Sequence, residues 1–223
     1  MEDGVVIRRA RLVILALAAA CGAPPVPAGA PPPTRARPDV QETPASALIP
    51  PGYGTLRQDD ISIVLESGNV RIAAIPLDES VIRTLAPDSY RGLHAYADDF
   101  KRRIAQIASM HGIRDPRVWY VRYDGLASDA RFVATDLTVT SGGRDYRPVD
   151  VVPISNGFGE GRLQPRETQR GLLVFEDGVD VSQPLAVSIG IVRNVDWDLV
   201  AGGILRKLDT ERASIRSRAA AHP

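Results

Sequence analysis

The sequence has a single cysteine, Cys21, and only three histidines among its 223 residues. One thiol cannot form an internal disulfide, and structural zinc or iron–sulfur sites need several cysteine or histidine ligands at set spacings. The sequence therefore predicts no zinc or iron–sulfur site, and we expect no bound metal or cofactor. A calcium site at aspartates in the predicted turns is the alternative. Lysine and arginine together number 27, as do aspartate and glutamate, so the formal net charge is zero. A neutral chain lacks the basic surface typical of nucleic-acid-binding proteins, and we expect no nucleic-acid partner.

A long hydrophobic run is also missing near the amino terminus. The apolar stretch Leu12–Ala20 is about half as long as the roughly 20 residues that a membrane-spanning helix needs. It follows a cluster of arginines, and small residues lead from it into Cys21. A basic region, a short apolar region and a small-residue cleavage site form the layout of a secretory signal peptide. We therefore predict that residues 1–20 are a signal peptide.

The residues before Cys21 resemble the lipobox of bacterial lipoproteins, in which cleavage falls just before a cysteine whose thiol is acylated. The chain reads Leu17-Ala18-Ala19-Ala20-Cys21. Leucine is commonest three residues before the cysteine in that family, whereas here alanine holds that place and the leucine lies one residue earlier. The resemblance implies lipidation of Cys21 and a membrane-anchored, extracytoplasmic location in the cell envelope, either periplasmic or at the surface. The alternative is a plain signal peptide followed by a chance cysteine.

Residues 21–51 are rich in proline and alanine and have no hydrophobic periodicity. Such a segment cannot bury enough surface to offset the entropy lost on ordering, and it favours extended polyproline II conformations. We predict a disordered tether that holds a folded domain away from the membrane.

Residues 52–199 are predicted to form a mainly β domain. The runs Ile61–Leu65 and Val70–Ile75 flank the turn cluster Ser67-Gly68-Asn69, which indicates a hairpin. Short runs with period-two alternation follow after residue 117. These further strands are expected at 118–123, 132–139, 146–154, 168–175 and 185–192. Many short strands separated by turn residues are typical of a β-sandwich.

A helical segment interrupts this pattern at about residues 78–111. Asp78 or Ser80 can cap a first turn, and Pro87 begins a longer helix. Apolar residues then recur at steps of three and four and so lie on one helical face. These residues are Leu93, Tyr96, Phe100, Ile104 and Ile107. We expect this amphipathic segment to pack on the sheet or on one end of it.

Two segments resemble the telokin-like, immunoglobulin-related domain of secreted bacterial lipoproteins. Phe132–Val139 is similar to an early core strand of that family, and Leu163–Glu176 to its run of leucine, proline, glycine, glutamate and a later glycine before an apolar strand. Arg166 stands where that family usually has glycine. The resemblance covers about residues 117–192. It implies an immunoglobulin-like β-sandwich with an inserted or packed α-helical segment, which serves as an interaction or scaffold domain without catalytic residues.

Within the second segment, Gly171 has a physical meaning of its own. A glycine inside a strand permits a bulge or a close approach by another part of the chain. We therefore expect one of these features at this position.

Candidates for catalysis are few. His94 and Asp98 lie four residues apart on the predicted helix and are neighbours on one face, which favours a surface contact over an acid–base or metal pair. The glycine-rich run Gly157–Gly161 lacks the helix and lysine of a phosphate-binding loop, so we interpret it as a strand connection. No serine nucleophile motif is present. We predict no catalytic residue and no enzymatic activity, with an envelope hydrolase that uses His94 as the alternative.

Trp119, Tyr120 and Tyr123 are the candidate ligand-binding residues. Their pattern is typical of core and sheet positions, but an exposed face would provide aromatic stacking for a glycan or a peptide. Residues 200–223 form a basic tail, interpreted as a short solvated helix, with contact to anionic lipid or cell wall as the alternative. Together these features predict a non-catalytic binding or structural module anchored in the membrane, with an envelope protein or glycan as partner. An accessory factor that docks a partner protein in transport or maturation is a further alternative.

Overall fold

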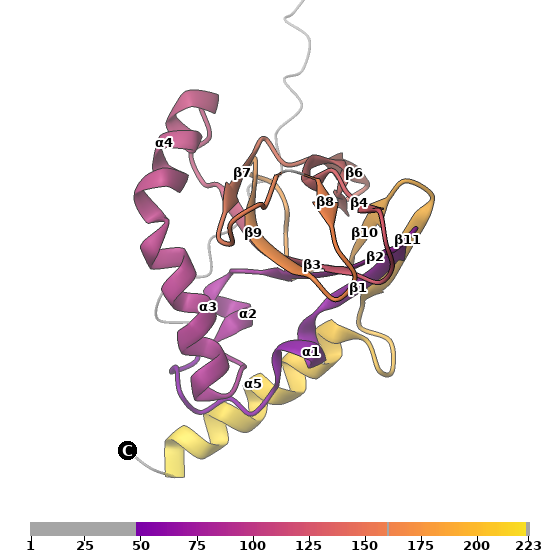
Figure 1. The fold of residues 1–223 in the computed structure, drawn as a ribbon. Coiled ribbons are helices and arrows are strands. Elements are labelled where there is room, and N and C mark those ends of the chain that lie inside the picture. The colour runs from indigo at the N-terminus through magenta and orange to yellow at the C-terminus, as the bar shows by residue number, and fades with distance from the viewer. Residues whose placement is uncertain (1–47, 160, 222–223) are drawn as a thin grey trace, which may run out of the picture. The chain divides into compact units, whose positions relative to one another are not determined.

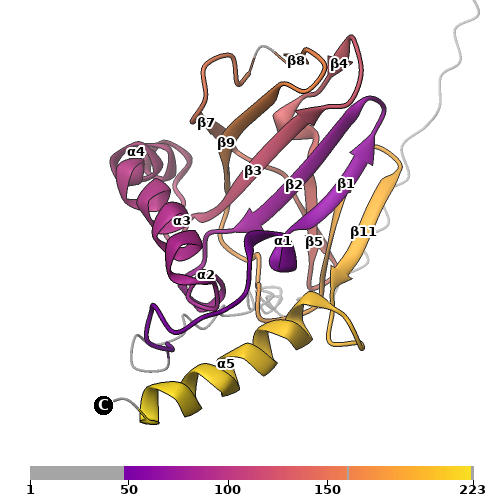
Figure 2. The same cartoon turned by 60° about the horizontal axis from the view of Figure 1, so that its bottom comes forward.

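The computed structural model describes residues 48–159 and 161–221. Cys21 and the predicted signal peptide lie outside the described residues, as does the predicted tether up to residue 47. The described part is mainly β, with antiparallel sheets flanked by helices (Figures 1 and 2), which confirms the predicted fold class at that level. No helix among these residues is both long and apolar enough to span a membrane.

The first sheet has five strands in the order β1-β2-β3-β9-β7, and every neighbouring pair is antiparallel. The strands are β1 (Ile63–Ser67), β2 (Val70–Pro76), β3 (Arg117–Gly125), β9 (Thr168–Phe175) and β7 (Asp150–Pro153). Ser67 pairs with Val70, so Gly68 and Asn69 form a two-residue turn between β1 and β2. The predicted hairpin is therefore confirmed.

The second sheet has the order β11-β10-β5-β6, and a two-stranded ribbon pairs β4 with β8. These strands are β4 (Ala130–Arg131), β5 (Thr138–Ser141), β6 (Arg144–Tyr146), β8 (Arg162–Leu163), β10 (Leu185–Ile189) and β11 (Val192–Trp197). Buried side chains of both larger sheets belong to one hydrophobic core. In this core the ring of Trp119 on β3 lies 6.5 Å from that of Trp197 on β11, measured between centroids.

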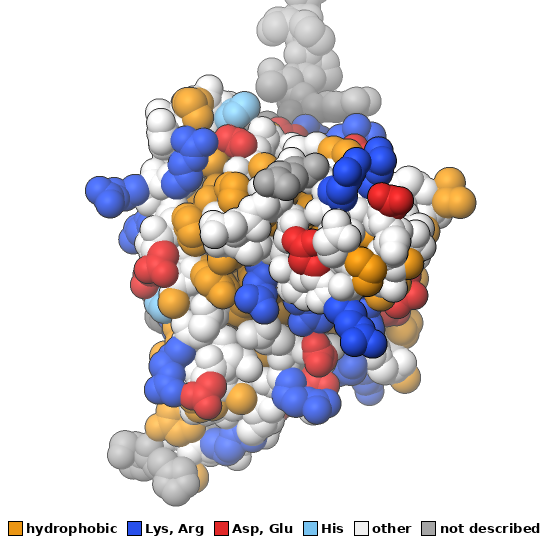
Figure 3. All heavy atoms as spheres, viewed as in Figure 1, with side chains coloured by type: hydrophobic (Ala, Val, Ile, Leu, Met, Phe, Trp, Pro, Cys, Tyr) orange, Lys and Arg blue, Asp and Glu red, His pale blue; other side chains and the backbone are white. Residues whose placement is uncertain are grey.

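The helices α2 (Glu79–Ile82), α3 (Pro87–Asp99) and α4 (Lys101–His111) are inserted between β2 and β3, in agreement with the predicted helical segment. The chain kinks at Phe100, which ends α3 and precedes α4 with φ −97° and ψ 3°. Tyr96 stacks on Tyr120 of β3 at 5.6 Å between ring centroids. Hydrophobic side chains remain visible at the surface between α4 and the first sheet (Figure 3).

The prediction of one strand over Phe132–Val139 is wrong. Strand β4 ends at Arg131, a 3-10 helix occupies Ala134–Asp136, and β5 begins only at Thr138. Phe132 and Leu137 are both buried. In a single straight strand two residues an odd number of positions apart point to opposite faces. The short helix turns both side chains into the core.

Two other predicted strands are each divided in the structure. The run 146–154 contains Pro148, which has no N–H to donate, and the chain leaves β6 at Tyr146 and enters β7 at Asp150. The run 185–192 contains a turn, because Ile189 pairs with Val192 across Gly190, which has φ +55°. Ile191 is the other residue of this turn, and its apolar side chain continues the hydrophobic pattern. The pattern therefore does not indicate the turn.

The carboxyl-terminal segment is part of the fold and is not a solvated tail. The helix α5 (Ile204–Ala221) buries one face, whose residues are Ile204, Leu205, Leu208, Glu211 and Ile215. The Glu211 carboxylate accepts hydrogen bonds from the backbone N–H of Thr55 (2.9 Å) and from its hydroxyl (3.0 Å). Arg218 also donates to Glu211. The short helix α1 (Gln58–Ile61) lies close to α5 as well.

The folded part also begins earlier than predicted. Ile49, placed by the sequence in the tether, is only 4% exposed. Its carbonyl oxygen accepts a hydrogen bond from Arg83 at 3.1 Å. The end of the predicted tether is thus packed against the domain.

Candidate functional site

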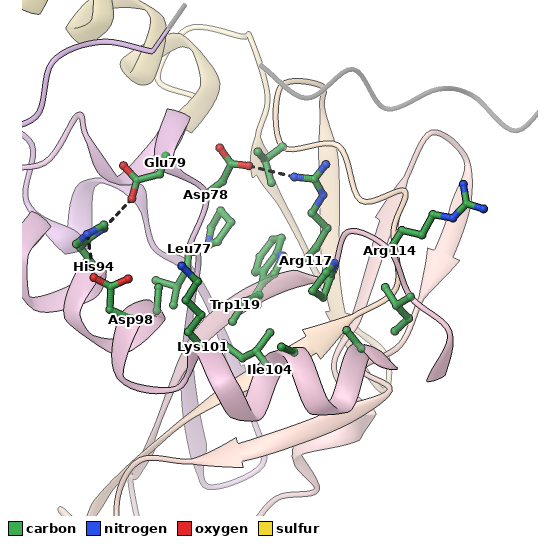
Figure 4. Close-up of a pocket in the computed structure, with 18 of the residues that line it drawn as sticks. Leu77, Asp78, Glu79, His94, Asp98, Lys101, Ile104, Arg114, Arg117 and Trp119 are labelled. Atoms are coloured by element: carbon green, nitrogen blue, oxygen red, sulfur yellow. Dashed lines mark hydrogen bonds and ion pairs between the residues drawn. The ribbon is translucent and has the colours of Figure 1, made fainter. Parts of the chain in front are cut away.

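A cavity of about 590 Å³ lies between helices α3 and α4 and the adjoining ends of β2 and β3 (Figure 4). We call it the α4 cavity. Its volume falls within the range of about 300–1,000 Å³ that is usual for small-molecule sites. The apolar part of its wall includes Pro76, Leu77, Ile104, Ala105, Ala108, Ile113, Val118, Trp119 and Val181.

The cavity is bordered by the two connections that join the helical insertion to the sheet. On the first connection, the N–H of Leu77 donates to the carbonyl oxygen of Val118 at 2.8 Å, and Asp78 then caps α2 by accepting from the N–H of Ser80. On the second, Gly112 ends α4 in the left-handed region, with φ +66°. These two local devices fix where the helices leave and rejoin the sheet.

Arg117 at the start of β3 is held by two carboxylates. Its Nη1 atom lies 3.4 Å from Oδ2 of Asp78, and its Nη2 atom lies 2.6 Å from Oδ2 of Asp115. Its Nε atom is buried and has no hydrogen-bond partner among the described residues. The guanidinium group thus joins both connections of the helical insertion while one of its donors stays unsatisfied.

His94 on α3 bridges two more carboxylates. Its Nδ1 atom lies 2.8 Å from Oε1 of Glu79, and its Nε2 atom lies 3.3 Å from Oδ2 of Asp98. The predicted contact between His94 and Asp98 is therefore confirmed. The hydroxyl of Tyr90 donates to Glu79 at 3.3 Å, and burial, followed by the nearby Glu79 charge, raises the pKa of Tyr90. Sequence reasoning missed Glu79, which belongs to another helix and carries no local signal.

The arrangement around His94 favours a bridging role over catalysis. A neutral imidazole donates from only one nitrogen, so only the protonated ring can donate to both carboxylates at once. A general base needs a nitrogen that faces a proton to be removed. Here a carboxylate occupies each nitrogen of His94. Within residues 48–159 and 161–221, no group of three or more histidine, cysteine or acidic residues is placed to hold a metal ion.

The side chains of two cations of the cavity wall, Lys101 and Arg114, form no hydrogen bond or ion pair with any residue that the structure describes. In Figure 4 the side chain of Lys101 reaches from α4 toward Leu77. Arg114 instead extends away from the other labelled side chains. Lys101 is therefore the one unpaired cation that the close-up shows within this space.

The three aromatic residues singled out from the sequence have separate positions. Trp119 and Tyr123 are fully buried, and Tyr120 is 6% exposed, so β3 does not present an open aromatic face. Trp119 lines the α4 cavity, and its indole N–H has no partner among the described residues. Ligand binding by Trp119 stays a prediction.

The other two rings lie outside the cavity wall. Tyr120 faces the helices, and burial raises its pKa. Tyr123 stacks on Phe132 at 4.1 Å between centroids and meets Phe158 edge-on, and burial raises its pKa as well. Phe158 belongs to the glycine-rich run between β7 and β8, whose described residues connect strands as predicted. This run covers the end of β3 that carries Tyr123.

Comparison with protein-family models, curated proteins and solved structures finds no match to this chain. No relative therefore supplies a ligand or a role for any residue of the α4 cavity.

Proposed function

We propose that this protein is a lipid-anchored lipoprotein of the cell envelope whose folded part is a non-catalytic ligand-binding module. The α4 cavity is the observation that carries the binding role, because it combines an apolar wall with charged groups at its edge. Such a combination is typical of small-molecule sites, in which apolar area supplies affinity and a few polar groups supply orientation. The arginine cluster, the short apolar run and the small residues before Cys21 support the anchor.

We also propose that the two larger sheets form an immunoglobulin-like, telokin-like sandwich with the helices inserted. Trp119 of the first sheet packs near Trp197 of the second, and Phe175 packs edge-on against Trp119. Arg166 supports the family resemblance, because its φ of +66° is the left-handed conformation that glycine adopts most easily. It stands where the resembling family usually has that glycine. An experimental structure with strand-by-strand comparison tests this assignment.

Filling the α4 cavity tests the binding role. Ala105 on α4 lines the cavity, whereas its neighbour Gln106 is exposed and does not. Octanol is a suitable apolar probe for isothermal titration calorimetry with the full chain carrying Cys21→Ala, which can be handled without detergent. We expect Ala105→Trp to abolish octanol binding and Gln106→Trp to leave it unchanged. Absence of binding to the parent chain, or equal binding by both tryptophan variants, would contradict the proposal.

Acyl labelling in cells tests the anchor. We expect the native chain to incorporate a labelled fatty acid and to fractionate with membranes. Cys21→Ala should lose both properties, because the thiol that carries the acyl group is gone. Unchanged membrane association of that variant would show that another part of the chain holds it there.

An envelope hydrolase is the second candidate, favoured by the position of His94 between Glu79 and Asp98 at the edge of the cavity. Turnover of an ester and peptide panel by the purified chain, lost in His94→Ala, would support it. We expect no turnover, because neither ring nitrogen faces a substrate. Docking of a partner protein is separated from both by cross-linking in intact cells.

A further inference from the structure

The charges around the α4 cavity are unevenly paired. Asp78 is paired with Arg117, and both Glu79 and Asp98 are paired with His94. Glu79 is also bound by Arg83. The carboxylates of the cavity wall are thus already engaged by Arg117, Arg83 and His94.

Lys101 differs from these carboxylates because its charge is not paired among the described residues. It is the first residue of α4, it is exposed, and it pairs with no acid among the residues that the structure describes. Its side chain reaches toward Leu77 in the apolar wall (Figure 4). An ammonium group beside apolar surface is less well screened than one in open water, and it therefore attracts an anion more strongly.

The unsatisfied hydrogen-bonding groups in this wall point to the same chemistry. The indole N–H of Trp119 and the Nε–H of Arg117 are buried without an acceptor. Both groups can donate but cannot accept. Among its described residues, the wall therefore has two cations without an acid partner and two buried donors without an acceptor, while its acids are paired. This balance favours a ligand that carries acceptor oxygens and negative charge.

We propose that the α4 cavity binds an apolar molecule that bears one carboxylate, with Lys101 as the residue that pairs with it. The apolar body lies against the wall formed by Leu77, Ile104 and Val118. A single negative charge fits better than a phosphate dianion, because the carboxylates of Asp78 and Asp98 stand in the same wall and repel excess charge. This ligand class rests on the proposed function, since it requires that the cavity is a binding site.

Three probes with the same apolar chain test the choice of charge: octanoate, octanol and octylammonium. Isothermal titration calorimetry with the full chain carrying Cys21→Ala measures each affinity. We expect octanoate to bind about tenfold more tightly than octanol, as a charge-assisted hydrogen bond provides, and octylammonium to bind more weakly than either. Lys101→Gln should lower octanoate affinity by about tenfold and leave octanol affinity unchanged.

Matched variants separate the role of this lysine from that of local charge. Arg102→Gln removes the neighbouring exposed cation, which does not line the cavity, and should leave the octanoate affinity unchanged. Lys101→Glu should reverse the order, so that octylammonium binds more tightly than octanoate. Both substitutions are at exposed positions, and thermal melting confirms that the variants fold.

The outcomes distinguish this inference from the proposed function. If octanoate and octanol bind equally and Lys101→Gln changes neither, the carboxylate assignment is overturned, while binding that Ala105→Trp abolishes still supports the cavity. If none of the probes binds, or Ala105→Trp has no effect, the binding role itself is overturned. A loss equal to that of Lys101→Gln in the Arg102→Gln variant would overturn the specific role of Lys101.

Discussion

The two ends of strand β3 carry aromatic residues on the same face, yet one end is filled and the other leaves a cavity. Tyr123 is covered by Phe132 and by Phe158, which belongs to the connection between β7 and β8. Trp119 packs against aromatic rings of the core but also lines the α4 cavity. The difference lies in what the rest of the chain places opposite each ring. A large aromatic residue therefore does not by itself determine whether a cavity remains beside it. The segments packed opposite the ring decide this.

The filled end should be the more sensitive to truncation. Phe132→Ala removes a buried ring stacked on Tyr123, and we expect it to lower the free energy of unfolding by about 3–5 kcal/mol. Val133→Ala, at the next residue, is a control with a side chain that is 54% exposed, and it should change stability by less than about 0.5 kcal/mol. Denaturant titration measures both. Equal losses would show that this end is not tightly packed.

The close approach at Gly171 provides a second test of the filled end. A Cβ atom at this position would lie 2.4 Å from a ring carbon of Phe158, which confirms the close approach expected from the sequence. We expect Gly171→Ala to cost about 2 kcal/mol through overpacking, and to cost less in a Phe158→Ala background.

A glycine without such a contact should behave in the opposite way. Gly92 lies within α3, and its Cβ position is open. Gly92→Ala should therefore stabilise the protein by about 0.5–1 kcal/mol, because alanine has the higher helix propensity.

Strictly additive effects of Gly171→Ala and Phe158→Ala on the free energy of unfolding would contradict the packing argument for Gly171.

The two buried tryptophans allow the open end to be compared with a satisfied neighbour. The indole N–H of Trp197 donates to the carbonyl oxygen of Val181 at 3.0 Å, whereas that of Trp119 has no partner among the described residues. Trp197→Phe should therefore cost about 1 kcal/mol more than Trp119→Phe in unfolding free energy. An equal or larger loss at Trp119 would indicate that its N–H is satisfied in solution.

A small effect is also expected at the turn that leads from β8 into β9. The N–H of Glu167 donates to the carbonyl oxygen of Gln164, with Pro165 and Arg166 at the centre of the turn. Arg166 has φ +66°, which strains an L-residue, and Arg166→Gly should stabilise the protein by about 0.5–1 kcal/mol. Arg166→Ala keeps the strain and should bring no gain. Thermal melting of both variants measures the difference, and a gain of the same size in alanine would contradict a conformational cause.

Local signals in the sequence predicted several elements well. The turn cluster at Gly68 identified the first hairpin, and the apolar run from Thr168 identified β9 with its observed bounds. The helical periodicity located α2–α4 but not the kink at Phe100. These features depend on neighbouring residues, so they can be read from a short window.

Elements that depend on distant partners could not be predicted in this way. The docking of α5 requires Thr55, and the division of Phe132–Val139 depends on which side chains the core accepts. In the candidate site, the spacing of His94 and Asp98 predicted their contact. Glu79 reaches His94 from 15 positions away in the sequence, and no local pattern records that approach.

The contact between Glu211 and Thr55 has a consequence for how the domain is assembled. It joins groups that are 156 positions apart in the chain, and it secures the first described residues against the last helix. A growing polypeptide cannot form this contact until the chain has been extended through Glu211 of α5. Native contacts of such long range also slow folding, because the ends must meet before they are stabilised. Completion of the domain is therefore coupled to delivery of its carboxyl-terminal helix.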